Sequence, residues 1–425
     1  MIIAGLLLGS TAGLAAGCGS GTRTDHESAG QAVATAAPVP KNGGWIASWI
    51  ASPQAAVPST AFAGGFRGQT IRNIVFTSAG GTLARIRLDN TFGRGALEIG
   101  RAAIAVAGRG AVTLPGTSVP LSFGGRGSTV IAPGSQAFSD PIPLAVRPLE
   151  RLAVSVFLPR STGPPTEHYD AHQTNYLASG DRVLAASGAA FTSPLESWYF
   201  VSGLDVWSSA HDRGAVVALG DSITNGNGSL TGANARWPND LARRLESLPG
   251  RSPGVVDAGI EGNRVLNGAP CCGPSAAARF ERDVLRQSGV REVIVLEGIN
   301  DITYSRSTSP LTLPHANVSA QQIIAGDREL IDRAHAAGLK IFGATLTPFA
   351  GSQRWTPAGE AKREAVNAWI RSSGAFDGVI DFAGVLADPV GPERLNPRYD
   401  DGDHLHPNDA GYRAMANAIA LGMLL

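Results

Sequence analysis

Ser222 stands in a sequence context that suits a nucleophile. It follows the apolar run 216–219 and the pair Gly220 and Asp221, and a turn and a helical pattern come after it. This order predicts a strand, a loop and a helix, with Ser222 at the carboxyl end of the strand, where ligands bind in open α/β sheets. Such a serine needs a base and hydrogen-bond donors for an oxyanion. Taken alone, the same residues also fit a serine that caps an ordinary helix.

A candidate base lies near the end of the chain, where Asp403 precedes His406 by three residues and Pro407 follows. An aspartate at this spacing can accept a hydrogen bond from the imidazole Nδ1–H and leave Nε2 free to take a proton. His404 has Asp401 at the same spacing, and this second pair remains an alternative.

Two further loops supply candidate oxyanion donors. Gly262 lies in the loop after the second predicted α/β strand, and a glycine lets a ligand approach the backbone N–H closely. Asn300 follows the third strand and offers a side-chain NH₂ group.

Four motifs follow one another along the chain: G-D-S at 220–222, G-N at 262–263, G-x-N-D at 298–301 and D-x-x-H-P at 403–407. This order resembles the SGNH, or GDSL-type, hydrolase superfamily over residues 214–425. The resemblance implies a flavodoxin-like three-layer α/β/α domain with a five-stranded parallel sheet. It also implies that Ser222 is the nucleophile, His406 the general base and Asp403 the residue that orients it. The implied oxyanion hole is formed by Ser222, Gly262 and Asn300. The resemblance further implies that Asp221, Asn263 and Asp301 are supporting residues.

The family resemblance implies a serine esterase that needs no metal and no cofactor. We expect short acyl or O-acetyl groups on carbohydrate or small esters as substrates, with a lipase or phospholipase-type acylhydrolase as the alternative. A non-enzymatic surface binding protein is a further alternative. A G-x-S-x-G motif is absent around Ser222, which argues against an α/β-hydrolase.

The C-terminal part, residues 211–425, alternates short apolar runs with helical patterns, as βαβ units do. The predicted strands are 215–219, 254–258, 293–297, 340–345 and 378–382. The predicted helices are 238–248, 275–288, 319–337, 357–373 and 407–424.

Residues 44–210 have the pattern of short strands separated by glycine-rich turns, with clear strands at 71–78, 82–88 and 152–158. This pattern predicts an all-β accessory domain of the sandwich or jelly-roll type. The segments 49–54 and 90–93 resemble the β-rich N-terminal domain of a two-domain bacterial subgroup of the same superfamily.

The N-terminus predicts export. Residues 1–18 combine a short apolar run with small residues before Cys18, which resembles a bacterial lipoprotein signal and makes Cys18 a candidate lipidation site. Residues 19–43 read as a linker. We therefore expect a secreted protein, or one attached to the cell-envelope membrane through Cys18.

The chain has 35 Lys and Arg against 35 Asp and Glu, so its charge gives no reason to expect a nucleic-acid partner. The expected partner is an ester substrate, such as an acylated polysaccharide or a lipid. Cys271 and Cys272 are adjacent, which predicts neither a disulfide framework nor a metal site.

Overall fold

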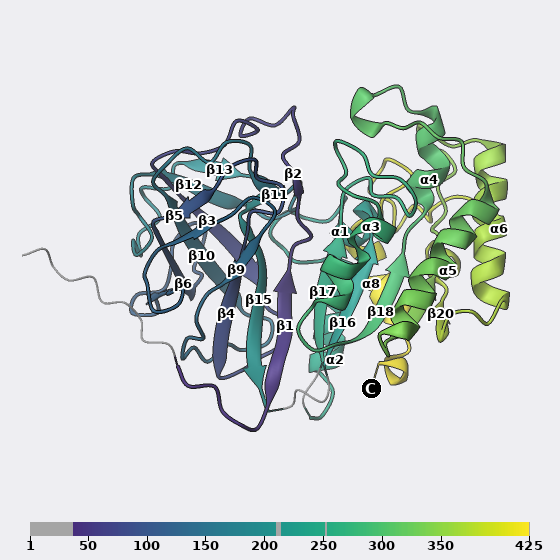
Figure 1. Cartoon of the computed structure of the whole chain (residues 1–425). Helices are drawn as coiled ribbons and strands as arrows, with labels where there is room; N and C mark the ends of the chain where they lie inside the picture. The colour runs from purple at the N-terminus through teal and green to yellow at the C-terminus, as the bar shows by residue number, and fades with distance from the viewer. Residues whose placement is uncertain (1–36, 210–213, 251–252, 425) are drawn as a thin grey trace, which may run out of the picture. The chain divides into compact units, whose positions relative to one another are not determined.

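The computed structural model describes residues 37–209, 214–250 and 253–424 (Figure 1). The predicted signal peptide, Cys18 and the larger part of the predicted linker lie outside these residues. No helix among the described residues is both long and apolar enough to span a membrane.

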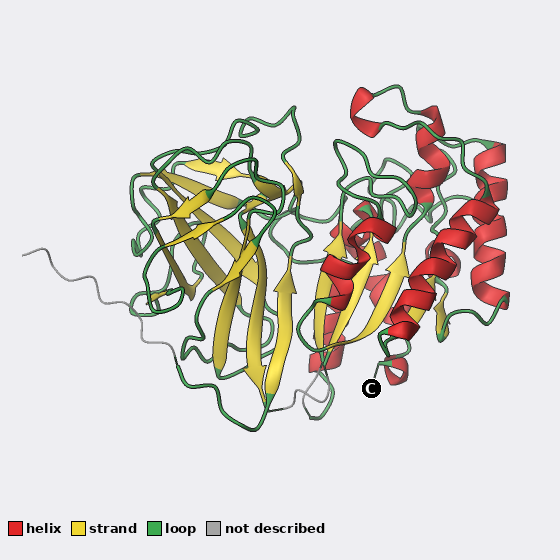
Figure 2. Cartoon of the chain, in the orientation of Figure 1, coloured by secondary structure: helices red, strands yellow, loops and turns green. Residues whose placement is uncertain are grey.

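The C-terminal region is built on one parallel sheet, coloured yellow among red helices in Figure 2. Its strands are β16 (Ala215–Gly220), β17 (Gly254–Gly259), β18 (Val290–Leu296), β19 (Lys340–Ala344) and β20 (Gly378–Ile380). They lie in the order β17-β16-β18-β19-β20, and every neighbouring pair is parallel. This flavodoxin-like order confirms the predicted fold class and places the topological switch point between β16 and β18.

Helices cover this sheet in two groups. The α-helices are α1 (Ser222–Asn225), α2 (Trp237–Glu246), α3 (Ala276–Phe280), α4 (Ile299–Thr303), α5 (Ala320–Ala336), α6 (Pro357–Ser372), α7 (Phe382–Leu386) and α8 (Asp409–Ala418). One group joins α2, α7 and α8, and the other joins α3, α5 and α6. Among the described residues, the short helices are the π-helical η2 (Glu281–Leu285) and the 3₁₀ turns η3 (Tyr304–Arg306), η4 (Pro310–Thr312) and η5 (Leu421–Met423).

The N-terminal region is strand-rich, and its strands pair in antiparallel fashion, as predicted. Its main sheets have the orders β1-β15-β4-β9 and β13-β12-β3-β10-β6-β7, and smaller ones are β14-β11-β2 and β5-β8. The strands are β1 (Gly44–Ile50), β2 (Gln54–Ala55), β3 (Gln69–Phe76), β4 (Leu83–Asp89), β5 (Leu97–Ile99), β6 (Arg101–Val106), β7 (Val119–Pro120), β8 (Thr129–Ile131), β9 (Gln136–Phe138), β10 (Arg151–Leu158), β11 (Thr166–His168), β12 (Asn175–Ser179), β13 (Ser193–Leu195), β14 (Trp198–Tyr199) and β15 (Val201–Ser208).

The β-rich region closes the edge of the parallel sheet at β17. The N–H of Val255 in β17 donates to Ser78 Oγ at 2.9 Å, and the N–H of Ala47 in β1 donates to the Ser288 carbonyl at 2.8 Å. A side chain on Gly254 would collide with the Ala47 carbonyl, so β1 approaches β17 closely. An exposed sheet edge is a liability for aggregation, and this contact removes it.

Candidate functional site

Ser222 lies where β16 ends and α1 begins, beside the switch point of the sheet. Asp221 caps this helix, because its Oδ1 accepts the N–H of Ile223 at 2.9 Å. Gly220 precedes Asp221, and a Cβ on Gly220 would lie 2.1 Å from Thr224 Oγ1 and 2.6 Å from the Leu296 carbonyl. Only glycine therefore permits the tight turn that presents Ser222 at the strand end.

His406 lies against Ser222 although 184 positions separate them in sequence. The distance from Ser222 Oγ to His406 Nε2 is 2.9 Å, and the distance from His406 Nδ1 to Asp403 Oδ2 is 2.6 Å. Asp403 Oδ1 also accepts the backbone N–H groups of Leu405 and His406, each at 2.8 Å. The loop thus fixes the carboxylate, the carboxylate orients the ring, and Nε2 is left to accept the serine proton.

The two charges of this pair stabilise each other. Burial by itself would raise the pKa of Asp403, but the hydrogen bond and charge of His406 and two backbone N–H groups bring that pKa far below its usual range. Burial by itself would lower the pKa of His406, but the Asp403 hydrogen bond and the charges of Glu261, Asp403 and Asp221 raise it. The site is therefore suited to forming an imidazolium.

The alternative histidine, His404, has a different environment. Its Nδ1 lies 2.6 Å from Asp400 Oδ2, so its partner is Asp400 and not the Asp401 that the spacing suggested. Its side chain is 54% exposed, while the side chain of His406 is 10% exposed. The structure brings Ser222 to His406.

The predicted oxyanion donors come from the ends of three neighbouring strands. Gly262 follows β17 with a φ of 66°, a left-handed conformation that favours glycine. A Cβ there would lie 2.1 Å from Tyr304 Oη and 2.6 Å from Cys272 Sγ, so the space behind it is filled. Within the described part of the chain, the N–H groups of Ser222 and Gly262 have no protein acceptor.

Asn300, the third predicted donor, lies on α4 after β18. Its Nδ2 donates to the Asn263 carbonyl at 3.0 Å and lies 3.5 Å from Asp221 Oδ2. The first contact uses one of the two amide hydrogens, and the second hydrogen faces a weak partner. The backbone carbonyl of Asn263 thereby orients the side-chain amide of Asn300.

The three predicted supporting residues brace these loops. Asn263 Nδ2 donates to the carbonyls of Cys272 and Pro274, at 2.7 and 2.8 Å. Asp301 accepts the N–H groups of Val265 and Leu266, at 2.7 and 3.1 Å. Burial raises the pKa of Asp221 to about 7 and that of Asp301 to about 6.

The expectation that Cys271 and Cys272 are not bridged is wrong, because the structure joins them in a disulfide between adjacent residues. Their Cα atoms are 3.8 Å apart, closer than in ordinary disulfides, which is why spacing argued against the bond. Side chains on both sides hold the turn in place: Gln54 donates to the Cys271 carbonyl and Asn263 to that of Cys272.

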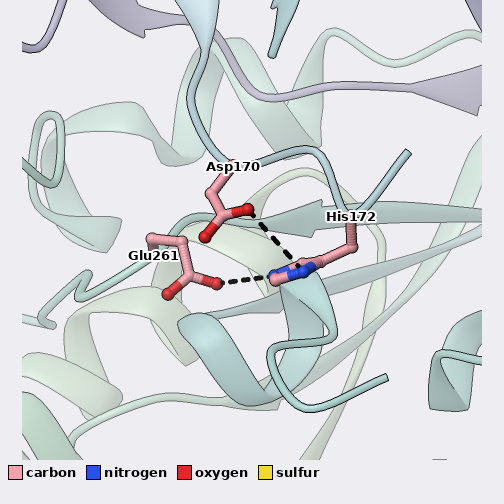
Figure 3. A group of neighbouring side chains, drawn as sticks. All are labelled: Asp170, His172 and Glu261. Carbon is pink, nitrogen blue, oxygen red and sulfur yellow. Dashed lines mark hydrogen bonds and ion pairs between the residues drawn. The ribbon is translucent and has the colours of Figure 1, made fainter. Parts of the chain in front are cut away.

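One part of the site was not predicted from the sequence. Glu261 precedes Gly262, and its Oε1 lies 3.1 Å from the Nε2 of His172, which lies in the loop between β11 and β12 (Figure 3). Asp170 of the same loop lies 3.7 Å from His172 Nδ1. His172 and Glu261 are 89 positions apart, and nothing in the sequence links them.

Two groups of described residues have the spacing of metal ligands: Asp170, His172 and Glu261, and Asp400, Asp401 and Asp403. In both groups, atoms that could bind a metal already form hydrogen bonds with other side chains of the protein. Glu261 accepts from Asn225 and Asn227 and lies against His172, while Asp403 holds His406. These carboxylates are engaged in hydrogen bonds that the fold itself provides.

Comparison with known families identifies the domain. The family model described as GDSL-like Lipase/Acylhydrolase matches residues 218–414, a range that contains every candidate residue from Ser222 to His406. This domain belongs to the GDSL-like lipase/acylhydrolase family. The chain therefore contains a GDSL-like hydrolase domain, which supports a carboxylic ester hydrolase.

Solved structures that resemble the chain are distant. A catalytic mutant of an acetylxylan esterase from Geobacillus stearothermophilus is 20% identical, with 49% of this chain and 93% of that chain covered and a TM-score of 0.38. A lipase/acylhydrolase from Enterococcus faecalis is 19% identical, with coverages of 49% and 95% and a TM-score of 0.36. A GDSL-like lipase from Bacteroides thetaiotaomicron is 18% identical, with coverages of 48% and 85% and a TM-score of 0.36. A search of curated proteins found no match.

Proposed function

We propose that the protein is an exported serine esterase in which Ser222, His406 and Asp403 form the catalytic triad. The observation that carries the proposal is the unbroken chain of hydrogen bonds, 2.9 Å from Ser222 Oγ to His406 Nε2 and 2.6 Å from His406 Nδ1 to Asp403 Oδ2. This is the arrangement that turns a weakly nucleophilic hydroxyl into an attacking group.

The proposed reaction begins when Ser222 Oγ attacks the ester carbonyl and His406 Nε2 takes its proton. The N–H groups of Ser222 and Gly262 and the amide of Asn300 stabilise the resulting oxyanion, and each such donor contributes roughly 10²–10³-fold in rate. His406 then protonates the departing alcohol. Water, deprotonated in turn by His406, hydrolyses the acyl-enzyme and restores Ser222.

For the substrate we propose esters with short acyl groups, such as acetate esters of carbohydrates. The crowded space behind Gly262 supports this choice, because Tyr304 and Cys272 fill it. Around Tyr304, the guanidinium groups of Arg264 and Arg354 lie 5.2 and 5.1 Å from the ring centre. A polar, filled wall of this kind suits a small acyl group better than a long apolar chain.

Export belongs to the proposal on the strength of the sequence. The apolar residues 2–8 and the small residues before Cys18 have the order of a lipoprotein signal. Attachment through a lipid on Cys18 is the corresponding proposal for membrane association.

Replacing Ser222 with Ala tests the nucleophile. We expect kcat for p-nitrophenyl acetate to fall at least about 10⁴-fold, because the attacking oxygen is lost. Fluorophosphonate labelling should disappear while the unfolding temperature stays close to that of the wild type. Ser229→Ala, in the turn after α1, is the matched control and should keep labelling and turnover. Equal turnover in Ser222→Ala would disprove the assignment.

A series of p-nitrophenyl esters from acetyl to palmitoyl, together with acetylated xylan, tests the substrate. We expect kcat/KM to be highest for the acetyl and butyryl esters and to fall with chain length. A steep increase toward the long chains would instead support the lipase-type alternative.

A further inference from the structure

The carboxylate of Glu261 joins three separate segments of the chain. Its Oε1 accepts a hydrogen bond from Asn225 Nδ2 at 3.0 Å, and its Oε2 accepts one from Asn227 Nδ2 at 3.1 Å. Asn225 is the last residue of α1, the helix that begins at Ser222. Glu261 itself is the residue before Gly262. One side chain therefore links the nucleophile helix to the loop that holds the oxyanion glycine.

The third segment comes from the β-rich region. His172 Nε2 lies 3.1 Å from Glu261 Oε1 (Figure 3). The Asp170 carbonyl also accepts a hydrogen bond from Asn225 Nδ2, at 2.8 Å. Asp170 and His172 have φ angles of 50° and 43°, uncommon values for residues other than glycine. The surrounding contacts hold this backbone in place, since Arg236 donates to the Ala171 carbonyl and Gly232 N–H to that of His172.

Glu261 is mostly buried, with a side chain 14% exposed, yet its partners keep it charged. Burial alone would raise the pKa of its carboxyl, but the hydrogen bond and charge of His172, the charge of His406 and the Asn225 amide lower it. Its negative charge in turn raises the pKa of His406. A charged carboxylate at this place thus acts on the base as well as on the loop.

We propose that Glu261 and His172 are positioning residues, through which the β-rich region holds the Gly262 loop against the Ser222 helix and stabilises the positive charge that forms on His406. The inference rests on the proposed function, because it assigns Glu261 to the same serine, oxyanion donor and base. The β-rich region then contributes directly to the hydrolytic site.

Replacing Glu261 with Gln tests the proposal, since the amide keeps the size of the side chain and removes its charge. We expect kcat for p-nitrophenyl acetate to fall roughly tenfold or more with little change in KM. The acid limb of kcat/KM against pH should move to lower pH, because His406 must be neutral to act as a base and its pKa falls when the anion is removed. A purely structural role would not move this limb.

The other charged and titratable groups that interact with the site are the same in the wild type and in Glu261→Gln, so this comparison isolates Glu261. Those that interact with Glu261 or His406 are His168, Tyr169, Asp170, His172, Asp221, Arg236, Tyr304, Asp401, Asp403 and Tyr412.

His172→Gln is the second variant, and it should also lower kcat with little change in KM. In the double variant the losses should not multiply, because both residues act through one carboxylate. Matched controls are His335→Gln and Glu281→Gln, which break the exposed pairs with Asp377 and Arg286 and should leave kcat and the pH profile unchanged.

Fluorophosphonate labelling of Ser222 in each variant separates this inference from the proposed function. If the wild type is not labelled and the Ser222→Ala variant is active, both the proposed function and the positioning role are overturned. A labelled, folded Glu261→Gln variant whose acid limb stays in place, or single losses that simply multiply, would overturn the positioning role alone. If Glu261→Gln does not fold, His172→Gln decides: unchanged kcat overturns the proposal, and a fall in kcat at constant KM supports it.

Discussion

Asp403 illustrates how one side chain can act entirely through another. It accepts three hydrogen bonds, two from its own loop and one from His406 Nδ1. The first two fix the carboxylate before any substrate binds, and the third sets which ring nitrogen carries the proton. The orientation of His406 toward Ser222 is therefore built into five consecutive residues of the loop that ends at Pro407.

Replacing Asp403 with Asn should lower kcat by roughly 10³–10⁴-fold, because the amide no longer stabilises the imidazolium or fixes the tautomer. The structure places the pKa of His406 above its ordinary value of 6.5, chiefly through Asp403 against the opposing effect of burial. The proposed mechanism needs neutral His406, so the acid limb of the residual activity should move to lower pH.

A pH–rate profile of p-nitrophenyl acetate hydrolysis measures both effects. His404→Gln is the matched control, and it should retain activity within about twofold because its ring bonds Asp400. A larger loss in His404→Gln than in Asp403→Asn would show that the alternative histidine is the base.

Short motifs single out Ser222, Gly262, Asn300, Asp403 and His406 as candidates from the sequence, because each follows a strand or precedes a helix at a recognisable position. Glu261 lies inside one of these motifs, but nothing in the sequence links it to His172. That contact depends on how the 168–173 loop folds, with two non-glycine residues at positive φ. Tertiary packing decides such a conformation, and local preference argues against it.

At the scale of elements, the five parallel strands were predicted because buried parallel strands are continuous apolar runs. Helix ends were predicted less well. The expected helix 407–424 ends at Ala418, because Ile419 is extended and Arg244 donates to the Ala416 and Ile419 carbonyls. A side chain from α2 thus satisfies carbonyls that another helical turn would have used.

The expected helix 275–288 also differs, because it divides into α3 and the π-helical turn η2. Arg279, at the join, donates to the carbonyls of Ala258 and Gly220 at the ends of β17 and β16, at 2.6 and 2.9 Å. Arg279 is buried and connects two strand ends through hydrogen bonds. A prediction from hydrophobic periodicity assigns an arginine to the solvent-facing side of a helix, so it cannot identify such a position.

At the scale of the whole molecule, β4 shows what an alternating pattern leaves open. Ala84, Ile86 and Leu88 alternate with Arg85 and Arg87 along this strand and are buried on one face. The opposite face is covered too, because Arg87 donates to Gln287 at 2.7 Å and Arg85 to Ser288 at 3.1 Å. The polar face of β4 therefore packs against the α/β region. The alternation of apolar and polar residues along a strand cannot show whether the polar face contacts protein or water.

These contacts bear on whether residues 44–210 and 211–425 behave as separate domains, as the sequence predicts. The described residues of both regions belong to one compact unit. Ile46 of β1 is 2% exposed, and its side chain packs beside Gly254 and Gly289 of the α/β region. We expect one cooperative unfolding transition for the whole unit, because the two regions share buried apolar and polar contacts.

Ile46→Ala tests this coupling. The variant should lose about 2–5 kcal/mol of unfolding free energy through lost burial and the cavity left behind. Because the unit unfolds together, calorimetry, near-UV circular dichroism and loss of esterase activity should all move to the same lower temperature. Leu330→Ala, on the buried face of α5 and far along the chain from β1, should move that same transition. Two transitions, with each variant moving only one of them, would show instead that the β-rich and α/β regions unfold independently, as separate domains do.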